Sequence, residues 1–209
     1  MAVDSKKIIE IASKLPVESN EKGIMAAFGV YAAMNYNEFF FKVVSQAIHG
    51  MNTHTVHTIE KKLYDAVLEC GYHTFHGIRS SMHWREYIKP LIASPEDEVA
   101  ALVAVTNIFG IGYIEVEELV PGERLVTVVK NAYDPGRYRD QFGRQPYGRC
   151  YMFSACTASY MDLVYSDPYP SGMGMYHARE VTCRAAGDPI CRFIAEREKG
   201  DGHATSSCG

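Results

Sequence analysis

Three residues with metal-binding side chains surround a predicted turn near the end of the sequence, in the stretch REVTCRAAGDPICRF at 179–193. They are Glu180, Cys183 and Cys191. A hairpin whose turn is centred near Gly187 places the two cysteines opposite each other, with Cβ atoms about 4.5–5.5 Å apart. Two facing thiols can share a metal ion, pack as buried free thiols or, with some adjustment, form a disulfide. The spacing by itself leaves these alternatives open.

Cys156 is the upstream residue that we expect to complete a metal site. Ser154 is expected to cap a helix over residues 156–165, so Cys156 falls in the first helical turn, where the positive end of the helix favours a thiolate. Together with the three residues around the turn it gives three thiolates and one carboxylate. That is a closed tetrahedral set, which is plausible for structural zinc.

This ligand set carries one geometric condition. In an ideal strand Glu180 and Cys183 point to opposite faces, because side chains alternate. A bulge or twist near Val181 and Thr182 must therefore bring them together. Cys150, which lies 30 residues before Glu180, is the competing candidate for the upstream ligand.

The elements that position these residues differ between the two halves of the chain. Helical spacing, capping residues and terminal glycines predict helices at 5–15, 21–36, 39–48, 52–70 (ending at Gly71) and 95–109. Alternating and β-branched runs predict strands at 113–119, 124–131, 176–185 and 190–195, with a polar connection at 134–149. The fold class predicted is α+β: helices packed on a twisted antiparallel sheet, with a helical N-terminal extension.

The length of 209 residues favours a single domain. Within it we expect a helical N-terminal part at 1–93, a metal-binding α/β part at 94–198 and a flexible tail at 199–209.

Composition narrows the classes of function. The net charge of −4 and a pI near 6.1 argue against a nucleic-acid surface. The most apolar stretch, 99–114, is shorter than the ~20 residues of a membrane span, and the N-terminus lacks a signal-peptide pattern. Six cysteines in 209 residues are too dilute for a disulfide scaffold. We expect a cytoplasmic protein that binds no nucleic acid and has no membrane span.

The run Glu180-x2-Cys183-x7-Cys191, with Gly187-Asp188 in the turn and Arg192-Phe193 after it, resembles the end of the 4-vinyl-reductase-type (hydrocarbon-binding) domain. The same domain senses effectors in phenol- and xylene-responsive transcriptional activators, and its fold is shared with subunits of vesicle-tethering complexes. In that family the glutamate, both hairpin cysteines and one upstream cysteine bind zinc. The resemblance, specific over about 150–196, thus implies a zinc site at Cys156, Glu180, Cys183 and Cys191.

The resemblance also implies a function. By analogy with the sensors, the zinc clamp walls off a pocket for a small hydrophobic or aromatic molecule, in a sensory or carrier role. The alternative is an enzyme or enzyme subunit in tetrapyrrole (vinyl reduction) or aromatic-compound metabolism, or a scaffold subunit. We expect a homodimer or a subunit of a larger assembly.

The ligand pocket departs from the sensor pattern. The sensors orient phenol with a histidine and a tryptophan, but the single tryptophan here, Trp84, lies far upstream. Tyr133, Tyr138 and Tyr147 are candidates to take its place, so the ligand need not be a phenol.

Histidines are frequent between His49 and His83. They can build a second metal or cofactor site, or form a solvated or interfacial helix surface, which we favour. No glutamate occupies the position needed for a zinc-protease HExxH motif.

Overall fold

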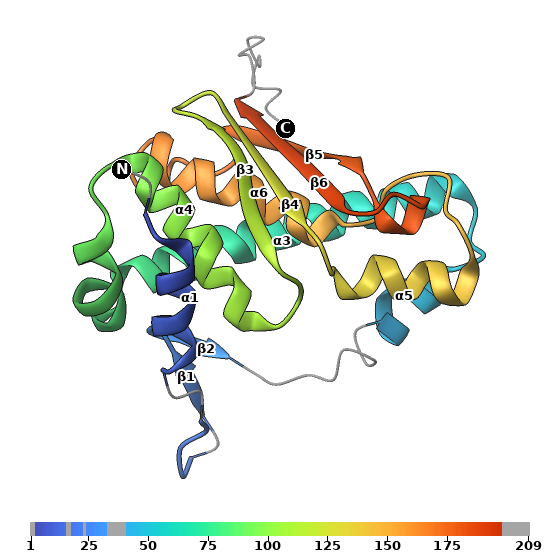
Figure 1. The fold of residues 1–209 in the computed structure, drawn as a ribbon. Helices are drawn as coiled ribbons and strands as arrows, with labels where there is room; N and C mark the ends of the chain where they lie inside the picture. Colours follow the sequence, from blue (N-terminus) through green and yellow to red (C-terminus); the bar gives the residue numbers. More distant parts are fainter. Residues whose placement is uncertain (1–2, 16–17, 23, 33–40, 198–209) are drawn as a thin grey trace, which may run out of the picture.

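A four-stranded antiparallel sheet lies at the centre of the computed structural model, which describes residues 3–15, 18–22, 24–32 and 41–197. The strand order is β3-β4-β6-β5 (Figure 1). Helix α6 (Tyr151–Tyr165) packs against β4, β5 and β6, and α3 (Thr53–Ser80) packs on α6. The predicted α+β class is therefore confirmed.

The strands agree with the alternating runs in the sequence. They are β3 (Ile114–Val120), β4 (Arg124–Val129), β5 (Tyr176–Thr182) and β6 (Cys191–Arg197). Every second side chain of β6 from Cys191 to Ala195 is fully buried, namely Cys191, Phe193 and Ala195, as expected for a strand with one face on the core. The last strand of the sheet thus carries one of the predicted metal ligands into the interior.

The predicted helix at 21–36 is wrong. The described residues of this segment form a hairpin of β1 (Met25–Ala27) and β2 (Val30–Ala32). Phe28 and Gly29, which connect the strands, have φ values of 51° and 72°, the left-handed pair of a two-residue hairpin. This turn interrupts the Ala- and Met-rich pattern that favours a helix.

Helix α3 passes through Gly71, where the sequence predicts its end. A Cβ on Gly71 would lie 3.1 Å from the hydroxyl of Ser159 on α6, so the glycine permits close packing of two helices and does not terminate one. Asn52 caps the helix by accepting from the backbone N–H of Thr55 at 2.9 Å. The helix continues for 28 residues to Ser80 and spans the length of the sheet layer (Figure 1).

The other predicted helices are confirmed in part. They are α1 (Ser5–Ser13), the π-helical turn η1 (Phe41–Gln46), α4 (Pro95–Thr106) and the 3₁₀ turn η4 (Asn107–Phe109). Ser94 caps α4 by accepting from the N–H of Asp97 at 3.2 Å, and Gly110 follows η4 with a φ of 70°, as predicted. Two short turns not predicted, η2 (Trp84–Ile88) and η3 (Lys89–Leu91), lie before α4.

Two elements near the predicted ligands differ from expectation. Helix α5 (Tyr133–Phe142) occupies part of the predicted connection at 134–149. Its Pro135 does not break the helix, because proline is tolerated in the first turn. Helix α6 begins at Tyr151, five residues earlier than predicted, and Ser154 lies inside it. A 3₁₀ turn, η5 (Arg184–Ala186), connects β5 toward β6. These shifts change which cysteine stands at a helix start.

The division of the chain at residue 94 stays a prediction, and the tail at 199–209 lies outside the described residues.

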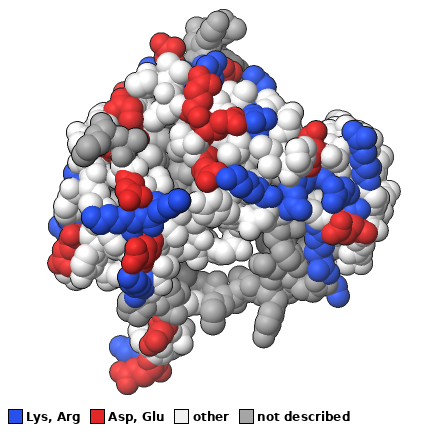
Figure 2. All heavy atoms as spheres, in the orientation of Figure 1, with Lys and Arg blue, Asp and Glu red and all other residues white. Residues whose placement is uncertain are grey.

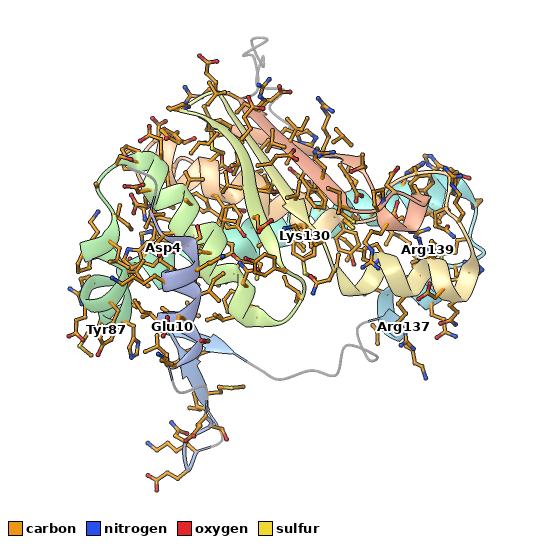
Figure 3. All side chains as sticks on the ribbon, viewed as in Figure 1. Asp4, Glu10, Tyr87, Lys130, Arg137 and Arg139 are labelled. Carbon is orange, nitrogen blue, oxygen red and sulfur yellow. The ribbon has the colours of Figure 1, made fainter. Side chains whose placement is uncertain are left out.

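Basic side chains gather at the α5 end of the face drawn in Figure 2. Arg137 and Arg139 project there from α5, whereas Asp4 and Glu10 belong to the α1 region (Figure 3). Among the described helices, none is long and apolar enough to cross a bilayer.

Candidate metal centre and adjoining groove

Four side chains converge at the corner where β5, β6 and the start of α6 meet. One ligand atom each from Cys150, Glu180, Cys183 and Cys191 lies within 4.8 Å of all the others. The Cys150 sulfur is 3.4 Å from that of Cys191 and 3.9 Å from that of Cys183. Zinc–sulfur bonds of about 2.3 Å place sulfurs about 3.8 Å apart on a tetrahedron. The cluster therefore has the size of a site for one metal ion.

The bulge that the sequence requires is present. Glu180 pairs with Phe193 and Thr182 pairs with Arg192, so Val181 is the extra residue on β5. A bulge of one residue reverses the alternation beyond it, which brings Glu180 and Cys183 onto the same side. The described cysteines are all free thiols, so the hairpin holds no disulfide.

Cys156 does not belong to this cluster, and the predicted set must be redrawn with Cys150 in its place. Cys156 lies in the second turn of α6 and is buried in the core. Burial, with a smaller contribution from the neighbouring Cys70, raises the pKa of its thiol to about 12. Such a thiol stays protonated and behaves as a small apolar side chain.

Cys150, the competing candidate in the sequence, has the position that was expected for Cys156. It is the N-cap residue of α6, immediately before Tyr151. The available signal was Gly148, a break directly before the run of apolar residues that starts at Tyr151. Ser154, expected to be the cap, donates its hydroxyl to the carbonyl of Ala178 at 3.0 Å from inside the helix.

The Glu180 carboxylate is held in place and still has an unused atom. Its Oε2 accepts a 2.9 Å hydrogen bond from the backbone N–H of Cys150. Its Oε1 is buried and makes no hydrogen bond within the described residues. A Cβ on Gly148 would overlap the carboxylate, so only glycine leaves room for this approach. A buried carboxylate oxygen aimed at three thiols is suited to a cation.

The pKa values of the cluster residues also indicate that a bound cation would be favourable here. Burial raises the pKa of the Cys150 thiol well above its ordinary value, and burial followed by the charge of Cys183 raises the pKa of Glu180 to about 8. Hydrogen bonds from Cys150 and Cys191 lower the pKa of the Cys183 thiol. Without a cation, the Cys183 thiolate is therefore favoured while Cys150 and Glu180 keep their protons, and a bound cation would favour the loss of these remaining protons.

The turn between the two hairpin cysteines is rigidly hydrogen-bonded. The Asp188 carboxylate accepts from the backbone N–H of Cys183 at 2.8 Å, and Gly187 has a φ of 99°. Arg144 donates its Nε to the carbonyl of Ala186 at 2.6 Å, which joins the turn to the segment after α5. These contacts fix the path of the turn that connects Cys183 to Cys191.

A groove of about 530 Å³ adjoins the cluster and lies between α3 and β5. Cys150 and Glu180 form part of its wall, so the groove and the candidate metal centre share residues. The groove is also lined by residues of α3 (Glu60, Tyr64, Asp65, Leu68), of the segment before and within α6 (Gly148, Arg149, Tyr151) and of β5 (Tyr176, His177, Ala178).

The tyrosines predicted to line a pocket have different positions. Tyr138 is 3% exposed and lies under the Arg149 guanidinium at 4.3 Å from its ring centre. Tyr147 lies 5.8 Å from the same guanidinium and 4.7 Å from the His57 ring. Neither lines the 530 Å³ groove, and the side chain of Tyr133 lies outside the described part. Tyr138 and Tyr147 thus lie around Arg149, which itself lines the groove.

The histidines between His49 and His83 do not converge. Most of them contact aromatic side chains in separate places. These are Tyr138 and Phe142 for His49, Tyr147 for His57, Tyr169 for both His73 and His76, and Phe28 and Tyr87 for His83. Among the described residues, the candidate metal cluster contains no histidine.

Comparison with known proteins identifies the fold. No protein-family model and no curated protein sequence matches the chain. Among solved structures, the chain is similar to the phenol-responsive sensory domain of the transcription activator PoxR, determined with phenol. The TM-score is 0.70 at 10% sequence identity, over 96% of this chain and 94% of that one. The chain therefore shares the fold of that domain, and the likeness extends to the N-terminal half.

Proposed function

We propose that this chain is a zinc-stabilised domain that binds a small hydrophobic or aromatic molecule in a sensory or carrier role. The observation that carries the proposal is the cluster of Cys150, Glu180, Cys183 and Cys191, which forms one wall of a groove of ligand size. The fold of a phenol-responsive sensory domain supports the choice of ligand class.

Zinc suits the donor set best. Three thiolates and one carboxylate match its preference for sulfur and its tetrahedral geometry, whereas calcium and magnesium take oxygen ligands. Four protein ligands leave no position for water or substrate, so the ion supplies structural cross-linking. Cys150 would join the start of α6 to the β5–β6 corner, and Glu180 would fix the groove wall.

The groove has the dimensions and part of the lining of a small-molecule site. Its volume of about 530 Å³ falls within the usual range of 300–1,000 Å³. Leu68, Ala178 and the rings of Tyr64 and Tyr176 provide apolar and aromatic surface. Tyr138 and Tyr147 act behind Arg149 in this proposal, holding its guanidinium at the groove.

The expected homodimer or larger assembly, in the cytoplasm, is part of the same proposal. Tyr31 is 84% exposed on β2, and Met82 and Tyr87 are exposed on the segment whose Ser81 and His83 lie against the β1–β2 turn. Exposed apolar side chains on neighbouring segments support a contact with another chain. Sedimentation of the wild type and of Tyr31→Ser tests this: an unchanged monomer in both removes the assembly from the proposal.

Metal analysis and ligand screening test the main proposal. The purified protein should contain close to one zinc per chain, and Cys150→Ala should reduce this strongly. Cys70→Ala is the matched control, because Cys70 is exposed and outside the cluster. Small aromatic compounds should raise the melting temperature of the zinc-loaded protein. A stably folded, metal-free wild type would overturn the zinc assignment.

A further inference from the structure

Three cysteines of the candidate metal centre lie close enough together to react with one another. The Cys150 sulfur is 3.4 Å from that of Cys191 and 3.9 Å from that of Cys183, and all three residues are free cysteines. A disulfide bond is about 2.05 Å long, so the Cys150 and Cys191 sulfurs need to approach by only about 1.4 Å. The arrangement that suits a metal ion therefore also places two thiols within reach of a disulfide.

The three cysteines differ in their access from outside. Cys150 is 6% exposed and forms part of the groove wall. Cys183 and Cys191 are 1% and 0% exposed, and neither lines the groove. A small molecule in the groove thus meets Cys150 first, and Cys191 holds the nearer of the two sulfurs behind it.

Resting on the proposed zinc site, we infer that this cluster is a redox switch. A hydroperoxide that enters the groove oxidises Cys150, and Cys191 then closes a disulfide that releases the ion. Zinc keeps its cysteine ligands as thiolates, and a thiolate is the nucleophile in both steps. An accessible cysteine beside a second cysteine that resolves it is the usual arrangement for reversible thiol oxidation.

The two steps balance in atoms and electrons. The Cys150 thiolate attacks the terminal oxygen of the hydroperoxide, the O–O bond breaks, Cys150 becomes a sulfenic acid, and the alkoxide leaves and takes a proton from water. The Cys191 thiolate then attacks the Cys150 sulfur, forms the S–S bond and expels hydroxide. The two thiolates lose two electrons, and the hydroperoxide is reduced to an alcohol and water. Zinc loses two of its four ligands, which is why it leaves.

Such a disulfide replaces only part of what the ion holds together. It still joins the start of α6 to β6, because Cys150 and Cys191 lie on these two elements. It leaves Glu180 and Cys183 without the ion, and Glu180 belongs to the groove wall. Oxidation therefore keeps α6 attached to β6 but frees one side of the groove, so the state of the thiols can reach the ligand site.

Hydrogen peroxide and the zinc-loaded wild type test the switch directly. A colorimetric chelator measures released zinc, and peptide mapping after alkylation identifies the disulfide. We expect roughly one zinc ion for each disulfide formed, a Cys150–Cys191 link, and Cys183 still open to alkylation. Dithiothreitol with added zinc should restore the starting state. The double variant Cys70→Ser with Cys208→Ser, which removes two cysteines that are not proposed ligands, should behave in the same way.

The route through the groove has its own matched pair of variants. Lys61 and Lys62 are adjacent exposed residues of α3, and Lys61 lines the groove whereas Lys62 does not. A tryptophan at position 61 would cover part of the groove. With the bulky cumene hydroperoxide, Lys61→Trp should release zinc severalfold more slowly than Lys62→Trp. Equal rates in the two variants overturn entry through the groove.

Failure of the switch is distinguishable from failure of the proposed function. Zinc that stays bound while thiols oxidise, a disulfide between another pair of cysteines, or release that dithiothreitol and zinc do not reverse overturns the inference and leaves the proposed function standing. A purified wild type that contains no zinc before any treatment overturns both.

Discussion

The Glu180 carboxylate and the Cys183 sulfur lie within 4.8 Å of each other, although residues three apart on a regular strand face opposite ways. The bulge at Val181 accounts for this, because β5 resumes pairing one residue out of step at Thr182. Cys150 reaches the same point from the start of α6, where its backbone N–H also binds Glu180 at 2.9 Å. The corner is thus built from three separate segments, and each can be tested.

Exchanging the upstream cysteines separates the two candidate ligand sets. Cys150→Ala should lower the zinc content from about one per chain to a small fraction and reduce the free energy of unfolding by at least about 3 kcal/mol, since structural metal binding contributes directly to folding. Cys156→Ala removes a buried thiol of the core and should cost about 1 kcal/mol with the zinc retained. Elemental analysis and urea unfolding measure both. Loss of zinc in Cys156→Ala instead would restore the set predicted from the sequence.

Gly148→Ala should weaken the metal site without touching a ligand. The added Cβ would overlap the Glu180 carboxylate and push it away from the thiols. We expect a 10- to 100-fold loss of zinc affinity, as is typical when a supporting contact of a metal ligand is disturbed. Competition with a chromogenic chelator measures it. Gly136→Ala on α5 is the control, because its Cβ would meet only the flexible Arg184 side chain; equal affinities in the two variants would show that Gly148 has no such role.

Removing the metal should loosen one corner of the domain more than the rest. The apolar core around Trp84, Tyr160 and Phe193 does not depend on the cluster, so it should stay protected. Hydrogen exchange of chelator-treated protein should show the largest loss of protection at residues 143–150 and 183–191. A uniform change over the whole chain would mean that the ion supports the entire fold.

Asp162 should make stability depend on pH. This buried carboxylate on α6 accepts backbone N–H bonds from Gly174, Met175 and Tyr176, and burial raises its pKa from the ordinary 3.8 to about 6. Between these values the folded state holds a proton that the unfolded state has released, so the contribution of Asp162 to the free energy of unfolding falls as the pH rises from about 4 to about 6.

Asp162→Asn removes this titration. The other titratable groups are present in both proteins, so their contributions to the pH dependence cancel when the two are compared. The free energy of unfolding of the wild type minus that of the variant should fall by up to about 3 kcal/mol as the pH rises through that window. Urea unfolding at several pH values measures the difference. A difference that does not change with pH would show that Asp162 titrates alike in the folded and unfolded states.

Local chemistry made several parts of the fold predictable. The cap at Ser94 and the glycine at 110 delimit their helix through contacts within a few residues. The hairpin register that pairs Thr182 with Arg192 follows from the turn at Gly187, and it is the register predicted from the sequence. An element whose limits depend on contacts within a few residues can be predicted from its own sequence.

Other features depend on distant partners and were not predictable in this way. Gly71 has the signature of a helix end, but α3 continues because Ser159 of α6 packs against it. The proline and glycine of α5 favour a loop, yet the segment is helical and packs on η5. In both places packing overrode the local preference.

The sequence by itself determined that Glu180, Cys183 and Cys191 surround one turn and that a bulge must rotate the glutamate toward the cysteines. These relations are set by strand alternation and turn geometry over a dozen residues. Only the tertiary structure decided the fourth member, because Cys150 and Cys156 are both plausible along the chain and differ in which side of α6 they occupy. The start of that helix at Tyr151, fixed by packing against β4, β5, β6 and α3, places Cys150 at the corner and leaves Cys156 in the core.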